Sequence, residues 1–396
     1  MDRSSTQWHA AAALPLFEAL NGAELVDFMP ILLDTLGPVV DPISVRLLIA
    51  DVEERVLNVW GESGRHPAPP ARWVATEGSA HGEVYRTGAP AQVEIEGHQG
   101  ILAPVTARRE RIGVLEVLID RPPTEDIQAA VSSAGLLLGY LITAADRWTD
   151  EFHVARRRKD MNLAAEIQWN LLPLAAVSTD RASLACALEP AYEVGGDAYD
   201  YSYGRRFITA GIFDAMGRGV NAARVSALGL AAFRNGRRCG LGLADQARLI
   251  HQTLVDRFDR EGFMTGQLLA VELDDPQRSL IVNAGHPSPL LQRDGDIAQV
   301  ELEIDFPFGM PFENRPTVQP LELRRGDRLV LFSDGVVEAR PDGGQLFGNA
   351  RLVETLQRLK HVPAREAARR LIAEVRAHRA GDLTDDATLI ILDLPR

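Results

Sequence analysis

Aspartates stand at the ends of several apolar segments in the C-terminal half of the chain. FITAGIF runs directly into FDAMGRG, so Asp214 lies where a predicted strand ends and two glycines permit a tight turn. DRLVLF runs into SDGVVEA, which puts Asp334 at a second strand end. GDLTDDATLIILDL places Asp385 and Asp386 just before a third strand, and VGGDAYD adds Asp197 after two glycines. We expect these four acidic sites to converge on one edge of a sheet.

Such a set of carboxylates suits a pair of divalent cations. Mg²⁺ and Mn²⁺ are hard cations that prefer oxygen ligands and keep several waters, so a few carboxylates plus a backbone carbonyl hold them. Two such ions about 3.5–4 Å apart activate a water and stabilise a phosphoryl group during in-line attack. The glycines of VGGD let the backbone approach the ions. The pattern therefore predicts phosphoryl hydrolysis with two Mn²⁺ or Mg²⁺ ions.

Each acidic motif also has a purely structural interpretation. Asp-Gly pairs such as Asp294-Gly295 are common hairpin turns, and Asp200, the second aspartate of VGGDAYD, suits a helix or turn cap. Taken singly, each motif is more often structural than functional. Their combination in one order along the chain favours a functional site.

Composition limits the class of protein. A chain of 396 residues is long enough for two or three domains, and 46% hydrophobic with 24% charged residues is typical of a globular protein. A net charge of -13 argues against a nucleic-acid surface or an anionic membrane as partner. Two cysteines, Cys186 and Cys239, provide no disulfide framework, and the N-terminus shows no secretory signal. We expect a cytoplasmic protein.

One uncharged segment, residues 127–145, has about the length of a membrane span. Polar residues dilute it and acidic residues flank both ends, so a buried or dimer-forming amphipathic helix is the favoured interpretation.

Residues 1–149 predict a small α+β module. A helical stretch, LPLFEALNGAELVDFMPILLDTL, precedes the apolar strands ISVRLLIAD and RVLNVWG. A helix in TEGSAHGEVYRTGAP, ended by its glycine, comes before a final pair of strands. The module resembles a GAF domain, with GSAHGEVYRTGAPAQV in place of that family's helix and following strand and PVTARRERIGVLEV in place of its last hairpin. The resemblance implies a sensor of an unidentified ligand or partner.

Residues 150–176 predict a helical linker within a stretch, 124–172, that looks helical almost throughout. Its basic run ARRRKD favours a solvated helix face, and Pro173 ends the helix. A continuous helix transmits displacement better than a flexible linker, so we expect Ile167, Leu171 and Leu172 to pack close to Asp197 and to couple the two ends. A passive tether is the alternative.

Residues 177–396 alternate predicted strands and helices. The strands include RRFITAGIF, QLLAVELD, RSLIVNAGH, PLLQR, DRLVLFSDG and ATLIILDL. The helices are NAARVSALGLAAFRNG, LADQARLIHQTLVDRF, NARLVETLQRLK and PAREAARRLIAEVRAH. Both kinds are substantial, so helices are expected to cover a largely antiparallel pair of sheets.

Five motifs together resemble a known family. VGGDAYD, FDAMGRG, NAGHPSPLL, LFSDGVVEA and DDATLIILDL occur in the order and approximate spacing of the metal-dependent protein phosphatases (PPM family), in the bacterial sporulation and stress-response branch. The resemblance implies an αββα sandwich that hydrolyses phosphoserine or phosphothreonine without a covalent intermediate. It implies metal binding by the carboxylates of Asp197, Asp214, Asp334 and Asp385 and by the carbonyl of Ala215. By family analogy the substrate is a phosphorylated anti-sigma-factor antagonist.

Two positions limit what this resemblance implies about the site. Arg218 stands in FDAMGRG where the family usually has histidine, and an arginine there either contacts the substrate phosphate or marks a changed loop. His286 of NAGHPSPLL is more often a structural histidine than a catalytic one. A non-catalytic binding module on a phosphatase fold remains the alternative function. A two-metal nuclease is disfavoured by the acidic balance, and a homodimer is compatible with the long linker.

Overall fold

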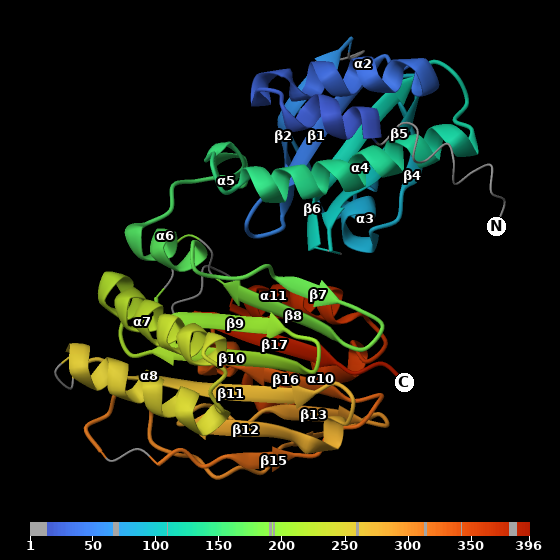
Figure 1. Ribbon diagram of the computed structural model, residues 1–396. Helices are drawn as coiled ribbons and strands as arrows, with labels where there is room; N and C mark the ends of the chain where they lie inside the picture. The colour runs from blue at the N-terminus through green and yellow to red at the C-terminus, as the bar shows by residue number, and fades with distance from the viewer. Residues whose placement is uncertain are drawn as a thin grey trace. The chain divides into compact units, whose positions relative to one another are not determined.

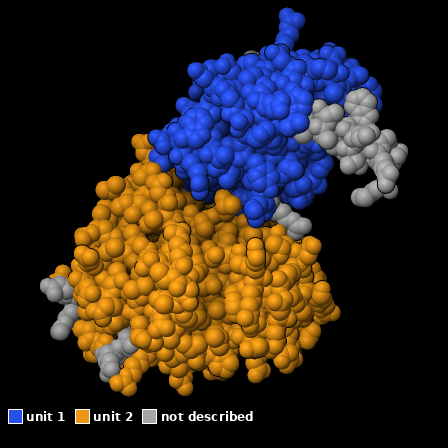
Figure 2. All heavy atoms as spheres, viewed as in Figure 1, with its two compact units in different colours: residues 1–159 blue, residues 160–396 orange. Residues whose placement is uncertain are grey.

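The computed structural model describes residues 14–65, 71–108, 110–189, 192, 195–258, 261–312, 315–341, 343–379 and 386–396. The chain forms two compact units, unit 1 from residue 1 to 159 and unit 2 from residue 160 to 396 (Figure 2). The division lies within the stretch predicted as linker.

Unit 1 is a six-stranded antiparallel sheet with helices on both faces (Figure 1). Its strand order is β3-β2-β1-β6-β5-β4. The elements are η1 (Leu25–Asp27), α2 (Phe28–Val40), β1 (Ser44–Ala50), β2 (Val56–Gly64), β3 (Trp73–Ala75), α3 (Ala80–Thr87), β4 (Ala91–Ile95), β5 (His98–Ala107), β6 (Glu110–Ile119) and α4 (Glu125–Ala145). This order contains the predicted helices and strands, with β4 where the resemblance implies a strand after the helix, and adds the short strand β3.

Strand β1 shows why both faces of this sheet are covered. All seven of its residues are buried, and successive side chains point to opposite faces. Val45, Leu47 and Ile49 belong to the core that α2 and α4 cover, whereas Leu48 and Ala50 belong to the core under α3. An apolar strand without alternation is typical of a sheet buried on both sides.

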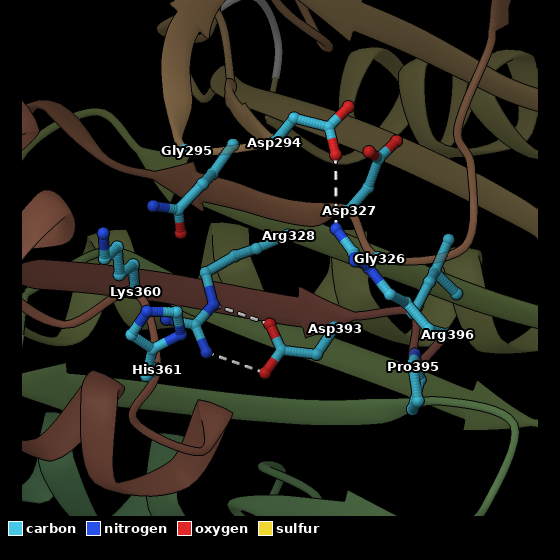
Figure 3. Close-up of a pocket in the computed structure, with 12 residues that line it drawn as sticks. Asp294, Gly295, Gly326, Asp327, Arg328, Lys360, His361, Asp393, Pro395 and Arg396 are labelled. Carbon is cyan, nitrogen blue, oxygen red and sulfur yellow. Dashed lines mark hydrogen bonds and ion pairs between the residues drawn. The ribbon is translucent and has the colours of Figure 1, made fainter.

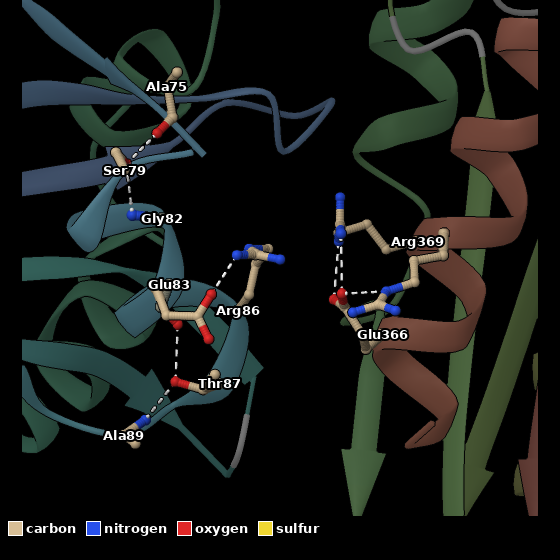
Figure 4. Close-up of polar contacts among 10 residues, drawn as sticks. Ala75, Ser79, Gly82, Glu83, Arg86, Thr87, Ala89, Glu366 and Arg369 are labelled. Atoms are coloured by element: carbon tan, nitrogen blue, oxygen red, sulfur yellow. Dashed lines mark hydrogen bonds and ion pairs between the residues drawn. The ribbon is translucent and has the colours of Figure 1, made fainter. Parts of the chain in front are cut away.

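Helix α3 begins and ends at local signals. The Ser79 hydroxyl accepts the amide hydrogen of Gly82 at 2.9 Å, which caps the helix N-terminus (Figure 4). Gly88 ends the helix with a positive φ of 70°. The predicted helix with a terminal glycine is confirmed.

Helix α4 contains the segment that has the length of a membrane span. It is the one helix in the described part of the chain that is long and apolar enough to cross a membrane, judged by length and composition. Its buried residues recur at helical spacing and face the sheet. A Cβ at Gly135 or Gly139 would lie 2.7 Å or 2.2 Å from a carbonyl oxygen of β5, so the two glycines allow close packing on that strand.

The prediction of a continuous helix after α4 is wrong. The chain forms only α5 (Glu151–Ala155) and α6 (Leu163–Trp169), with non-helical residues between them. The side chain of Asn162 accepts the amide hydrogen of Ala165 at 2.8 Å and so starts a new helix.

The basic run after α5 is held by unit 1 itself. The Arg158 guanidinium lies 3.0 Å from the buried Asp51 carboxylate and 2.5 Å from Glu53. The amide of Val52 donates to the Arg156 carbonyl at 3.0 Å. These contacts to the turn between β1 and β2 replace helix continuation, so the solvated helix face expected here is wrong for Arg158.

Unit 2 is a sandwich of two antiparallel sheets between helices (Figure 1). One sheet has the order β15-β12-β11-β10-β9 and the other β14-β13-β16-β17-β8-β7. The strands are β7 (Ala176–Ser178), β8 (Ser183–Glu189), β9 (Asp197–Tyr203), β10 (Phe207–Ala215), β11 (Met264–Glu272), β12 (Ser279–Ala284), β13 (Leu290–Arg293), β14 (Asp296–Gln299), β15 (Gln319–Leu321), β16 (Arg328–Phe332) and β17 (Ala387–Asp393). The helices are α6, α7 (Gly219–Arg238), α8 (Leu243–Phe258), η2 (Pro276–Arg278), α9 (Asp334–Glu338), α10 (Gly348–Arg358) and α11 (Ala364–Arg379).

Three apolar layers fill this sandwich. Ile208, Ile212 and Leu331 belong to the core between the sheets. A second core includes Phe213 of β10 with Phe233 of α7, and a third joins residues of α10 and α11 to the other sheet. Glu366 fastens the start of α11 through ion pairs with Arg369 and Arg370 (Figure 4 shows the Arg369 pair). The predicted αββα sandwich is the architecture of unit 2.

The β13–β14 hairpin turns at Asp294 and Gly295, with φ of 50° and 100°. Positive φ at both central residues is the geometry of a tight hairpin turn, which confirms the structural interpretation of this Asp-Gly pair.

Candidate metal centre

The first two predicted carboxylates lie side by side. Asp197 is the first residue of β9, and Asp214 is the residue directly opposite it on β10. Asp197 is only 2% exposed. Adjacent strands therefore hold two aspartates next to each other at one end of the sheet.

The surroundings of Asp197 leave its negative charge poorly compensated. Burial raises the pKa of the Asp197 carboxyl well above its usual range, and the nearby carboxylates of Asp214 and Asp386 raise it further. Hydrogen bonds to Ser333 and Thr388 act in the opposite direction. A buried carboxyl group whose neighbours are also carboxylates is an electrostatic condition that a divalent cation relieves.

The glycines of VGGD are required by close backbone contact. A Cβ at Gly196 would lie 2.1 Å from the carbonyl oxygen of Ala215, and no real side chain tolerates that distance. The carbonyl of Gly196 in turn accepts the amide of Ala215 at 3.2 Å and the hydroxyl of Ser226. The glycine therefore lets the loop before Asp197 pass directly over the end of β10.

Asp386 positions this loop. Its Oδ2 accepts the amide hydrogens of Gly195 at 2.6 Å and of Asp197 at 3.2 Å. Asp386 is buried and directly precedes β17, so the start of one strand fixes the start of β9 in the other sheet. The sequence analysis gave Asp386 no role of its own, although its place in DDAT beside a predicted ligand was visible.

Ser333 joins the third predicted carboxylate to the first. Its hydroxyl donates to the Asp197 carboxylate at 2.6 Å and accepts the amide of Thr388 at 3.0 Å. Ser333 directly precedes Asp334, the first residue of α9. The sequence analysis missed Ser333, whose only signal was its adjacency to Asp334.

The predicted ligand set is brought together in part. Asp214 and Ala215 end β10, and Asp334 begins α9. Asp197 lies opposite Asp214 and accepts a hydrogen bond from Ser333, the residue before Asp334. Asp385 lies outside the described residues. Across the described ranges no three histidine, cysteine or acidic side chains are already placed as a metal-binding group. The oxygen donors and the uncompensated charge nevertheless fit a hard divalent cation.

Asp200 has a different task from Asp197. It is buried and lies 2.8 Å from both Arg234 and Arg237 of α7. Arg234 also donates to the carbonyl of Leu171. The prediction that Asp200 caps a helix or turn is wrong, because its carboxylate binds α7 and, through Arg234, the segment after α6.

Arg218 occupies the position before α7. It is exposed and extended, with φ of -143°, between Gly217 and Gly219, whose φ values are 94° and 67°. The two left-handed glycines turn the chain sharply from the end of β10 into α7. Arg218 thus stands three residues after Ala215, on the turn that directly follows two predicted metal ligands.

His286 is a structural residue in this geometry. Its Nδ1 lies 2.8 Å from the Thr265 hydroxyl, and its backbone exchanges hydrogen bonds with the side chain of Asn283. Burial lowers the pKa of His286 to about 3, so the imidazole is neutral near pH 7. Thr265 pairs with Asp214 across β10 and β11, so His286 contacts the residue directly opposite a predicted metal ligand.

We expect acid to destabilise the fold through His286. The pKa of His286 is 6.5 in the unfolded chain and about 3 in the folded chain, so its contribution to the free energy of unfolding is full above pH 6.5 and is lost as the pH falls toward 3. Lowering the pH from 7 to 5 is expected to reduce the free energy of unfolding by about 2 kcal/mol through this group. Urea unfolding at both pH values measures the loss in the wild type and in His286→Gln. An equal pH dependence in the two proteins contradicts the assignment.

Comparison with known proteins finds similarity in the C-terminal part of the chain. Residues 206–395 match the family described as Stage II sporulation protein E (SpoIIE). Phosphoserine phosphatase RsbU of Bacillus subtilis is 23% identical over 260 residues, covering 65% of this chain and 76% of RsbU. The PP2C phosphatase domain of SpoIIE from Bacillus subtilis, solved with a fragment of its regulatory domain, is 25% identical with a TM-score of 0.49, covering 54% of this chain and 64% of that one.

A further solved structure is the catalytic domain of the serine threonine protein phosphatase PstP in complex with two manganese ions. It is 20% identical with a TM-score of 0.41, covering 54% of this chain and all of that one, 100%.

The αββα sandwich of unit 2, together with these matches, defines a metal-dependent protein phosphatase domain. Over residues 206–395 this domain is similar to the SpoIIE family.

Proposed function

We propose that the protein hydrolyses phosphoserine or phosphothreonine in a protein substrate, with two Mn²⁺ or Mg²⁺ ions at the acidic edge of unit 2. The observation that carries this proposal is the buried Asp197 beside Asp214, with its charge left uncompensated. Asp197, Asp214, Asp334 and Asp385 would hold the ions, together with the carbonyl of Ala215. When bound, the ions supply an activated water and neutralise charge on the phosphoryl group.

The chain's own residues prepare this edge. Asp386 fixes the amides of Gly195 and Asp197, and Ser333 orients the Asp197 carboxylate. Their hydrogen bonds reduce the reorganisation that binding cations would otherwise require. The buried surroundings keep the effective dielectric low, which strengthens the attraction of the carboxylates for cations.

Hydrolysis of p-nitrophenyl phosphate by the purified full chain tests the proposal. We expect turnover with Mn²⁺ or Mg²⁺ and none with chelator, because the proposed attack uses a water that the ions activate. Ion binding also raises the melting temperature, since it stabilises the folded state alone. Unchanged stability and no turnover with either ion would favour the alternative of a non-catalytic binding module.

The proposed substrate and location are supported by similarity to a known phosphatase and by the net charge of the chain. RsbU is named as a phosphoserine phosphatase, and by analogy we propose a phosphorylated anti-sigma-factor antagonist as substrate. A net charge of -13 is consistent with a protein partner and a cytoplasmic location, and not with nucleic acid or an anionic membrane surface. A homodimer is part of the same proposal.

Regulation by unit 1, as a GAF-like sensor, is the second part of the proposal. Leu171 and Leu172, which follow α6, pack against the core that contains Ala198 and Ala215. Arg234 connects the Leu171 carbonyl to Asp200 on β9, the strand that begins with Asp197. A displacement of residues 163–172 would therefore reach the acidic edge through packed and hydrogen-bonded contacts.

Insertion of two glycines between Arg158 and Lys159, one residue before the division between the two units, tests this coupling. We expect Mn²⁺-dependent turnover to change by at least about threefold, a barrier change of about 0.65 kcal/mol. The matched control inserts two glycines between Glu96 and Gly97, in the exposed β4–β5 turn. Equal turnover in all three proteins makes the segment a passive tether.

A further inference from the structure

Unit 2 contains a pocket away from the acidic edge. Its volume is about 560 Å³, within the range of roughly 300–1,000 Å³ that small-molecule sites occupy. Residues that line it include Gln292, Asp294, Arg328, Lys360, His361 and Arg396. Figure 3 shows Lys360 and His361 together on one side, with Pro395 and Arg396 on the other.

The pocket lies at the opposite end of the same strands that carry the metal ligands. Arg328 begins β16, whereas Asp334 follows the end of that strand. Six residues of extended chain separate them, a distance of roughly 20 Å. A ligand in the pocket therefore occupies a site separate from the acidic edge.

Most charges that line the pocket are already neutralised. Arg328 binds Asp393 through two contacts of 2.6 Å and 2.8 Å. Asp327 is bound in the same bidentate way by Arg293, at 3.0 Å and 2.7 Å. Each pair satisfies a carboxylate with a planar guanidinium, so neither attracts a ligand charge.

Lys360 and His361 remain available on the exposed loop between α10 and α11. The chain contains only two lysines, Lys159 and Lys360. The ion pairs described above, together with the 3.3 Å contact of Arg396 with Asp294, engage the other charged residues that line this pocket but not the Lys360 ammonium. An ammonium group outside these pairs is suited to bind an anionic ligand.

Gln292 is the second, independent feature. It is 7% exposed, and neither atom of its side-chain amide has a hydrogen-bond partner among the described residues. Buried polar groups are normally paired, because removing them from water without a partner is unfavourable. A ligand edge with one donor next to one acceptor satisfies both atoms of a side-chain amide, as the edge of adenine does.

We propose that this pocket binds a purine nucleotide, with its phosphate at Lys360 and His361 and the donor–acceptor edge of its base on Gln292. The two requirements, an anion and a paired hydrogen-bonding edge, are met in one molecule of the size that the pocket accommodates.

Amine acetylation of the full chain tests the proposal directly, because the two lysines report on two places. Mass spectrometry follows the acetylation rates of Lys360 and Lys159 with AMP or GMP, and with chelator present to exclude hydrolysis. At ten times its Kd, a bound nucleotide slows acetylation of Lys360 by about tenfold and leaves Lys159 unchanged. Absence of protection by both nucleotides overturns the proposal.

Two comparisons identify the ligand chemistry. Inorganic phosphate at the same concentration is expected to protect Lys360 far less, and equal protection overturns the assignment to a nucleotide. Gln292→Leu is expected to raise the AMP Kd at least about tenfold, while the exposed Gln252→Leu leaves it unchanged. Loss of phosphoester hydrolysis in the same protein would leave this result intact, so the two functions fail separately.

Discussion

Asp334→Asn is expected to lower Mn²⁺-dependent hydrolysis of p-nitrophenyl phosphate at least about 1,000-fold, a barrier increase of about 4 kcal/mol. Asp334 begins α9 directly after Ser333, whose hydroxyl binds the Asp197 carboxylate. The amide keeps the size of the side chain but removes a negative charge that a cation requires. The melting temperature of the metal-free protein is expected to stay near that of the wild type.

Asp296→Asn is the matched control. Asp296 is exposed on β14, at the edge of the same sheet, so the same chemical change there leaves turnover unaltered. Near wild-type turnover of Asp334→Asn would show that the metal assignment in SDGVVEA is wrong.

Gly196→Ala is expected to lower turnover at least about 100-fold, because a backbone shift of about 1 Å at a catalytic site has that effect. The new Cβ would lie 2.1 Å from the Ala215 carbonyl oxygen, so either the loop before Asp197 or the end of β10 must move. Both carry proposed metal ligands, and the Mn²⁺ concentration for half-maximal turnover is expected to rise.

The stability of the same variant gives a second measurement. Overpacking of this kind costs about 1–3 kcal/mol in the free energy of unfolding, which urea titration detects. Gly242→Ala is the matched control, since a Cβ there meets nothing within 4 Å and is expected to change stability by less than about 0.5 kcal/mol. Full turnover of Gly196→Ala would contradict the role assigned to this contact.

Much of unit 2 could be predicted because its strands are apolar runs bounded by turn residues. The predicted segments correspond to β10 to β13, β16 and β17, and the four predicted helices to α7, α8, α10 and α11. Strand β9 was not among them. Its sequence, DAYDYSY, lacks an apolar run, and long-range pairing with β10 rather than local preference makes it a strand.

The prediction of a continuous helical linker was wrong for a related reason. Helical periodicity over residues 124–172 is a local signal, whereas the chain after α5 is redirected by Arg158 and its distant partner Asp51. Sequence spacing does not reveal such a contact. The roles of Asp386 and Ser333 were equally invisible, because each acts through a partner more than 130 residues away in the chain.

The contact of Asp386 with the VGGD loop has a consequence for synthesis of the protein. The amides of Gly195 and Asp197 donate to the carboxylate of Asp386, which the ribosome adds about 190 residues later. Strand β17, which follows it, lies in the middle of its sheet between β16 and β8. A growing chain therefore contains Asp197, Asp214 and Asp334 before Asp386, the residue that holds the loop at the start of β9, has been added.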